Sequence, residues 1–487
     1  MTNEWHAQGL LGERTGGYSS PMRLRALSWA ALVLLSVPTV ASAHAHLQRS
    51  RPAAGATLHE VPRLLRLEFS EAPELAVSSV RLLDANRREI TLSPLRTVAA
   101  DSLRVVIADI TGQLSAGRYT VRWQIAGRDG HPVHGEFEFV VGTDAAGQIP
   151  TAPVPIIQPA AASPAAPPPP VVAPGREFDA ESPLFVVVRW AQFLGLLAVI
   201  GAMAFRFAVV GRVPSGDLDA ATRDDATARS LRAAILGALL LAASAIARLV
   251  AQMTALREGA ATGMQLEIIH VWSTWWGEIW VGHAAAAIVL IAGLLVARRT
   301  AVVGWAIAAF ATLLLAFTLA GSGHAAASGS TFAMVVDALH VLAAGGWMGG
   351  LLMLVLAGLP AARSLPEAPR RAAMAALVNA FSSSALAFAT LIVVTGVLAA
   401  WRNIETLGAL FGSSYGRVLL LKIAALAVAA FIGLYNWRRA RPALAVTGDD
   451  RPIRSAMRAE LVAGVVILLI TAVLVATPIP ADLVAMR

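Results

Sequence analysis

Two regions of this chain differ in how their apolar residues are spaced. From residue 183 onward, apolar runs of about twenty residues recur, which is the length that a helix needs to cross a bilayer. Their length and hydropathy predict about eight membrane helices, near 184–210, 232–253, 276–297, 301–321, 332–358, 378–401, 417–437 and 459–477. Residues 44–143 instead carry short runs in which apolar and polar residues alternate, as half-buried strands require.

The alternating region predicts a small all-β domain. Pro, Gly, Asp and Asn separate its runs, and the last run places phenylalanines on one face and glutamates on the other. Strands are predicted at Leu64–Phe69, Val80–Leu83, Leu103–Ile107, Tyr119–Ile125 and Glu136–Val141. This pattern suits a Greek-key or immunoglobulin-like sandwich. The predicted fold is therefore an N-terminal all-β sandwich joined to an all-α membrane domain.

The segments around these two regions set the expected domain boundaries. Residues 1–43 combine an N-terminal extension with an export signal: a basic start at Met22, an apolar stretch and an Ala-Ser-Ala end follow in the usual order. We expect translation to begin at Met22 and cleavage to expose His44. Residues 144–182 are rich in Pro and Ala and predict an extended linker. The expected domains are thus a β domain at 44–143 and a polytopic membrane domain at 183–487.

Charge follows the predicted topology. The net charge is +8, and the arginines gather in alternate loops, around 206–232, 298–299, 363–371 and 438–458. The positive-inside rule and the export signal independently place the β domain and the C-terminus outside a bacterial inner membrane. The lipid bilayer is therefore an expected partner. Nucleic acid is excluded, because no basic stripe carries interleaved aromatic residues.

The start of the exported domain offers metal ligands. The chain has no cysteine, so a metal must be held by His, Met, carboxylate or amine groups. Cleavage before His44 would present its α-amine and imidazole as a chelating pair, a donor set that suits Cu(II). Asp129 and His131 are two residues apart, so in an extended segment their side chains leave from the same side. His46 and His134 are further candidates, although His131-Pro132 is also ordinary turn chemistry.

These residues fall in motifs that resemble the CopC family of periplasmic copper-binding proteins. The motifs are His44-Ala45-His46-Leu47 followed by Arg51–Gly55, then Phe69-Ser70-Glu71, and then Asp129-Gly130-His131-Pro132-Val133. The resemblance implies a Cu(II) site made by His44, Glu71, Asp129 and His131. The exported domain has no methionine, so the Met-rich Cu(I) site of some relatives is not expected here.

The membrane region holds a second group of candidate ligands. Asp337 and His340 are three residues apart, hence on one helical face, and Met348 falls on the same side of the helix. His324 lies in the short loop before this helix. Polar groups inside spans are costly and point to function, and thioethers favour Cu(I). Methionine in such a helix is also ordinary packing material, and Asp337 could instead pair with Lys422, the only lysine.

The helical half resembles the CopD family of inner-membrane copper-resistance proteins. The resemblance rests on Asp337–Val341, Gly345–Gly350, Tyr415-Gly416-Arg417 before Lys422, Tyr435-Asn436 and Ala476-Thr477-Pro478. It implies copper homeostasis rather than enzymatic activity. The exported domain would bind Cu(II) and the helices would move copper across the membrane, inward, with copper ions and other periplasmic copper proteins as partners. No phosphate-binding loop is present, so this chain would not drive transport with ATP.

Two other functions remain open from the sequence. A terminal histidine with a second histidine also occurs in copper monooxygenases, which are redox enzymes. A haem-binding membrane protein could use His283, His324 and His340. The roles of Glu278, His283 and Lys422 are not decided by their positions alone.

Overall fold

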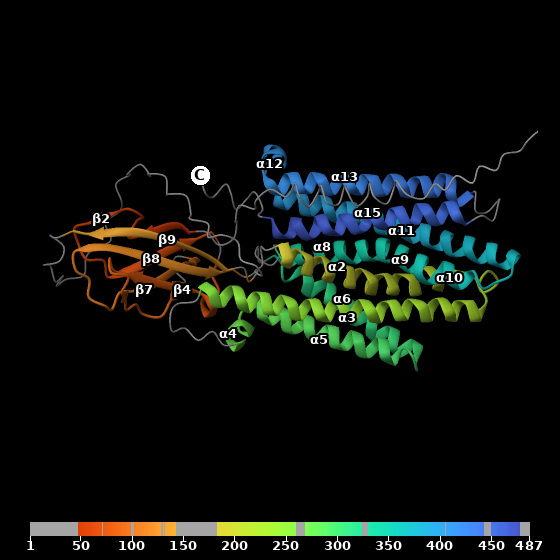
Figure 1. Ribbon diagram of the computed structural model, residues 1–487, viewed down its shortest axis with the longest axis horizontal. Helices are drawn as coiled ribbons and strands as arrows, with labels where there is room; N and C mark the ends of the chain where they lie inside the picture. The colour runs from red at the N-terminus through yellow and green to blue at the C-terminus, as the bar shows by residue number, and fades with distance from the viewer. Residues whose placement is uncertain are drawn as a thin grey trace, which may run out of the picture. The chain divides into compact units, whose positions relative to one another are not determined.

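The computed structural model describes residues 47–70, 72–98, 102–127, 130, 132–142, 183–259, 268–323, 330–404, 406–442 and 450–477. The predicted export signal and the whole predicted linker, 144–182, lie outside these residues, so their boundaries stay predictions. The described residues form a β domain and a set of long helices (Figure 1).

The β domain is a sandwich of two sheets. Its strands are β1 (Leu47–Arg51), β2 (Thr57–Leu58), β3 (Leu64–Phe69), β4 (Ser79–Leu83), β5 (Glu89–Ile90), β6 (Arg96–Val98), β7 (Ser102–Asp109), β8 (Gly117–Ala126) and β9 (Pro132–Val141). One sheet has the order β1-β3-β7-β6 and the other β2-β9-β8-β4-β5. The short 3₁₀ helix η1 (Leu75–Val77) joins β3 to β4. All five strands predicted from alternation are confirmed, four of them within two residues at each end, while β9 begins four residues before the predicted start at Glu136.

Alternation places large apolar side chains between the two sheets. Phe69 of β3 meets Trp123 of β8 edge-on, with ring centroids 5.3 Å apart. On the outer face of the β8–β9 pair, Arg122 lies opposite Glu136 and their side chains form an ion pair of 2.8 Å. One face of these strands is therefore core and the other is solvated, as the sequence predicts.

The helical region contains eight helices that are long and apolar enough to span a membrane, counted over the described residues. They are Pro183–Arg212 (α2, η2 and η3), Ala220–Arg257 (within α3, Ala220–Gly259), Trp275–Val296 (α5), Ala301–Ala320 (α6), Thr331–Ala362 (α8 to α10), Glu367–Asn403 (α11), Ser414–Ala440 (α13 and η6) and Arg451–Ala476 (α15). Two short helices, α4 (Ile268–Trp272) and α12 (Leu407–Gly412), precede α5 and α13. Figure 1 shows the long helices running side by side. The prediction of about eight spans is confirmed, and several helices extend further into polar sequence than their apolar runs.

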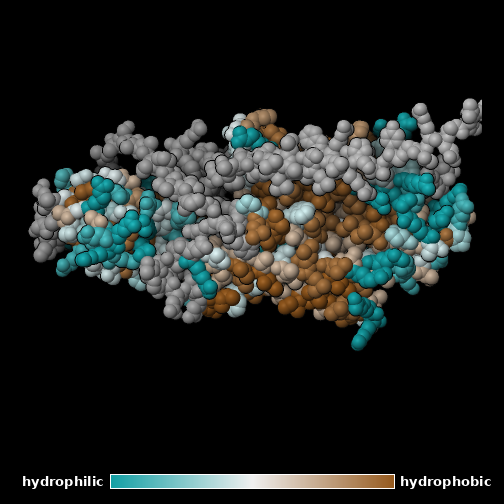
Figure 2. Space-filling view, in the orientation of Figure 1, coloured by the Kyte–Doolittle hydropathy of each residue, from teal (hydrophilic) through white to brown (hydrophobic). Residues whose placement is uncertain are grey.

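The outer surface of these helices is apolar. Leu236, Ile288 and Phe431 are each more than two-thirds exposed although they lie well inside long helices. Figure 2 shows such side chains gathered along the middle of the helices, with hydrophilic ones gathered at the end that holds α10. A surface of this kind is stable against hydrocarbon rather than water.

Among the described residues of the helical region, four stretches are π-helical: η2 (Phe205–Val209), η4 (Gly345–Gly349), η5 (Leu354–Gly358) and η6 (Asn436–Ala440). Segment η4 lies directly against α2. A Cβ added to Gly349 would be 2.1 Å from the carbonyl oxygen of Leu197, and one added to Gly201 would be 2.2 Å from the carbonyl carbon of Gly349. The two backbones therefore touch, and glycine permits this approach.

Candidate functional site

Most predicted ligands of the exported domain fall outside the described residues. These are His44, His46, Glu71, Asp129 and His131. Their positions can be followed only through the neighbours that the structure describes. Leu47, where β1 begins, lies opposite Phe69, where β3 ends. The chain therefore enters β1 and leaves β3 at the same end of one sheet.

The turn between β8 and β9 belongs to this end of the sandwich as well. The backbone N–H of Glu74, which follows β3, donates to the carbonyl of Ala126 at the end of β8 (2.8 Å). Beyond Ala126, the N–H of Gly130 donates to the carbonyl of Gly127 (2.9 Å), and Gly130 has a φ of +83°, which favours glycine. Described residues adjoining all three predicted ligand segments thus meet at one end of the domain.

His134 is the one candidate of the exported domain that the structure describes. It lies on β9 opposite Gln124 and its side chain is exposed. Within the described ranges, no group of three or more His, Asp or Glu side chains could hold a metal ion.

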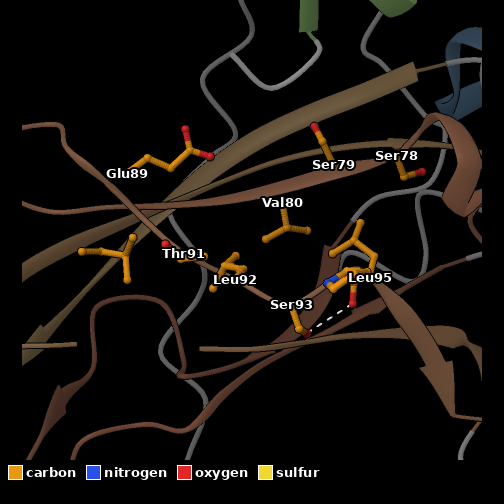
Figure 3. A pocket seen from close by; sticks show the side chains of 10 residues that line it. Ser78, Ser79, Val80, Glu89, Thr91, Leu92, Ser93 and Leu95 are labelled. Atoms are coloured by element: carbon orange, nitrogen blue, oxygen red, sulfur yellow. Dashed lines mark hydrogen bonds between the residues drawn. The ribbon is translucent and has the colours of Figure 1, made fainter. Parts of the chain in front are cut away.

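A hollow on the surface of the β domain does not provide such a set of ligands. It has a volume of about 450 Å³ and is bounded by β4, β5 and the segment after β5 (Figure 3). Its lining consists of hydroxyl and aliphatic side chains plus one carboxylate, that of Glu89, which is ion-paired with Arg81 at 3.0 Å. Without imidazole, amine or thioether groups, it is not suited to copper.

In the helical region, Asp337 and His340 of α8 lie in a polar cluster with residues of α11 and α13. Asp337 forms an ion pair with Arg402 of α11 at 3.8 Å. Lys422 of α13 is near enough to act electrostatically on both Asp337 and His340. Asp337 thus has Arg402 as its ion-pair partner, rather than the Lys422 considered from the sequence.

The hydrogen bonds around His340 assign its tautomer. The hydroxyl of Thr395 donates to the carbonyl of Leu391 (2.6 Å), so its oxygen accepts from Nδ1 of His340 (2.9 Å). Nδ1 then carries the proton and Nε2 keeps its lone pair. In histidine metal ligands one ring nitrogen is commonly held by such a hydrogen bond while the other binds the metal.

Met348 lies two turns beyond His340, in the π-helical segment η4. It is buried, and its Sδ would be 3.1 Å from a Cβ placed on Gly464 of α15. Met334 is also buried, at the other end of α8, beside Gly321. The fourth membrane candidate, His324, lies outside the described residues.

A separate buried chain of hydrogen bonds involves His283 of α5. Arg248 Nη1 donates to Gln192 Oε1 (3.2 Å), which directs Gln192 Nε2 toward His283 Nε2 (3.3 Å). His283 Nε2 must then accept, and its Nδ1 donates to the hydroxyl of Thr318 (2.9 Å). Both ring nitrogens are engaged, so His283 is not poised to bind a haem iron or a copper ion.

The sequence interpretation missed Glu460 as a buried ionisable group. Glu460 lies in α15, is 4% exposed, and accepts a hydrogen bond from Asn436 Nδ2 of η6 (3.0 Å). The signal was present in the sequence, because Glu460 falls within the predicted span 459–477. The arginines just before it, Arg454 and Arg458, mark this end of the helix as a charged boundary.

Family models match three parts of the chain. Residues 47–142 match the CopC domain, residues 179–333 the N-terminal domain of copper resistance protein D-like proteins, and residues 375–474 copper resistance protein D.

Individual relatives match either most of this chain or the β domain alone. The copper transport protein CutJ of Bacillus subtilis (strain 168) is 24% identical over 463 residues, 93% of this chain and 77% of CutJ. Protein YobA of Escherichia coli (strain K12) is 32% identical over 120 residues, 24% of this chain and 95% of YobA.

Among solved structures, CopC from Methylosinus trichosporium OB3b is 30% identical, with a TM-score of 0.19, over 20% of this chain and 94% of that one. PcoC, a methionine-rich copper resistance protein from Escherichia coli, is 24% identical, with a TM-score of 0.19, over 20% of this chain and 99% of PcoC.

Proposed function

We propose a copper-transfer function for this chain, which belongs to the copper resistance family that joins a CopC domain to a CopD membrane domain. The β domain would bind Cu(II) outside the inner membrane, and the helices would carry copper inward. The observation that carries the proposal is the meeting of the three segments next to the predicted ligands at one end of the sandwich. The name of CutJ, a copper transport protein similar along most of this chain, supports it.

The proposed Cu(II) site uses the α-amine and imidazole of His44, the imidazole of His131, and carboxylate oxygen from Glu71 or Asp129. Nitrogen donors with one or two carboxylates favour Cu(II) over other abundant divalent ions. His46 and His134 are secondary candidates. Because amine and imidazole must be deprotonated to bind, copper and protons compete for this site.

The proposed path through the helices begins at Asp337 and His340. The imidazole is held at Nδ1 by Thr395 and offers the Nε2 lone pair, while the carboxylate supplies negative charge. Met348 is the next soft donor along the same helix, and its thioether suits Cu(I). His324, in the loop before α8, would act at the entrance.

The direction of the chain in the membrane follows from charge. The ends of the helices around residues 206–232, 363–371 and 438–458 carry most of the arginines of the helical region. These ends would face the cytoplasm. The β domain and the C-terminus would then lie outside. Asp337, His340 and Lys422 fall toward the same side as the β domain.

Cellular copper content tests this proposal. Strains producing the full chain with His44→Ala or His340→Ala should accumulate several-fold less copper than the wild type when copper is limiting. His59→Ala, an exposed histidine of the β domain outside the proposed site, is the matched control and should leave accumulation unchanged. Unchanged copper in both site variants, with normal protein levels, would refute import by this chain.

A further inference from the structure

Arg248 is a buried cation inside a membrane helix. It lies on α3 and is 7% exposed, and its Nη1 donates to Gln192 Oε1 of α2 at 3.2 Å. Its Nε is buried and has no hydrogen-bond partner among the described residues. A guanidinium group does not lose its proton in proteins, so the positive charge stays. Such a charge inside a span is costly and points to a function.

No described carboxylate balances this charge. Helices α2 and α6 carry no acidic residue over their described lengths. The acidic residues of α3 are Asp224, Asp225 and Glu258, and the nearest of them is ten residues from Arg248, about 15 Å along the helix. Glu278 of α5 is exposed. Within the described part of the chain, none of these carboxylates forms an ion pair with Arg248.

The neutral groups beyond Arg248 are already bonded to one another. Gln192 Nε2 donates to His283 Nε2 of α5 at 3.3 Å, and His283 Nδ1 donates to the hydroxyl of Thr318 of α6 at 2.9 Å. That hydroxyl donates in turn to the carbonyl of Leu315 at 3.1 Å. This chain of hydrogen bonds fixes the side chains of four helices but contains no negative charge.

A small pocket lies beside these groups. It has a volume of about 10 Å³ and is lined by Arg248, Gln192, His283 and Thr318 together with the rings of Trp276 and Trp280. A single water molecule needs about 10–15 Å³ of such space, so the pocket suits a particle of one heavy atom and excludes phosphate and organic acids. The indole rings keep the surroundings poor in water, which strengthens any charge interaction inside.

A second guanidinium group adds to the preference for an anion. Arg189 of α2 is 4% exposed and lies near enough to act electrostatically on Arg248 as a like charge. A water molecule in the pocket would leave the charge of Arg248 uncompensated. A single-atom anion would compensate it and would also reduce the repulsion between the two arginines.

We propose that this pocket binds a chloride ion, held by the guanidinium group of Arg248. The ion accepts from the guanidinium N–H groups and joins α2, α3, α5 and α6 around one balanced charge. Trp276 is the second residue of α5 and Ser322, which also lines the pocket, lies two residues beyond the end of α6. These are the helix ends that the charge pattern places outside, where chloride is abundant. The site is separate from the proposed copper path and does not depend on it.

Thermal stability in chloride tests the site. The full chain in detergent is heated in sodium chloride or in sodium gluconate at the same ionic strength, because gluconate is too large for the pocket. The melting temperature of the wild type should rise with chloride and then saturate, by roughly 5–10 °C when chloride exceeds its Kd about 100-fold. Arg248→Gln should melt at the same temperature in both salts. Arg257→Gln changes an exposed arginine of the same helix and, as the matched control, should keep the full chloride effect.

Two further measurements decide the matter if Arg248→Gln does not fold. Arg248→Lys keeps the charge but moves the donor, so it should need several-fold more chloride for half of the effect. The nuclear magnetic resonance line of chloride should broaden in the presence of the wild type, and bromide, the halide of nearest size, should reverse the broadening whereas gluconate should not.

Three results would overturn the chloride site. They are a wild-type melting temperature that does not depend on chloride, a chloride line that bromide leaves broadened, and a chloride effect in Arg248→Gln or Arg248→Lys equal to that of Arg257→Gln. None of these measurements involves copper, so their outcome and that of the copper accumulation experiment are independent.

Discussion

The contact between Gly349 and α2 can be tested by adding a single methyl group. In Gly349→Ala the new Cβ would stand 2.1 Å from the carbonyl oxygen of Leu197 and 2.7 Å from Cα of Gly201. Both neighbours are backbone atoms of a buried helix, so neither can rotate away. An ordinary carbon–oxygen contact requires η4 and α2 to separate by about 1 Å.

The loss of stability follows from the packing that is disturbed when η4 and α2 move apart. Overpacking of a close contact typically destabilises a protein by about 1–3 kcal/mol. For a domain of this size, that corresponds to a melting temperature lower by roughly 2–10 °C. Because Met348 precedes Gly349 in η4, the same shift would displace its thioether from Gly464. Copper transfer should therefore fall together with stability.

The measurement is the melting temperature of the detergent-solubilised full chain, followed by loss of the monodisperse fraction on heating. Gly282→Ala is the matched control, since its Cβ would meet only a methyl group of Thr318 at 3.6 Å. That variant should be neutral or slightly more stable, because alanine is the better helix former. If Gly349→Ala melts at the same temperature as Gly282→Ala, the close approach of η4 and α2 does not hold.

Three further outcomes are expected. Thr395→Val removes the acceptor that holds Nδ1 of His340 and should weaken Cu(I) binding by the helical region about 10-fold or more, measured by competition with a Cu(I) chelator. Tyr119→Phe removes two hydrogen bonds of 2.9 Å, one to the N–H and one to the carbonyl of Ser115. Their loss should destabilise the β domain by about 1–3 kcal/mol. Unfolding followed by tryptophan fluorescence should then occur at a lower urea concentration. Cu(II) binding through His44 should weaken as the pH falls from about 7 to 5, because the amine and the imidazole take up protons. The amount of bound copper is followed by EPR during the pH titration. If no bound copper is lost over this range, this ligand set is wrong.

Local pattern was enough to predict the framework of the fold. A strand with one buried face must alternate, and a helix in lipid must stay apolar for about twenty residues, so both leave a signal within a short window. The strands from Leu64–Phe69 to Glu136–Val141 and the eight long helices are therefore confirmed. The glycines within 345–350 permit a close helix contact, and the structure shows that Gly349 makes it with α2.

The sequence by itself determined which residue types could meet copper and the type of every major element. Only the tertiary structure decided the pairings: Arg402 beside Asp337, Thr395 on His340, and Asn436 on Glu460. Each pairing joins side chains of two different helices, and helical periodicity specifies which face a residue occupies without specifying what packs against that face. The environment of Glu460 could not be predicted for this reason, since its burial and the unpartnered carbonyl oxygen of Asn436 beside it exist only once η6 and α15 are packed together.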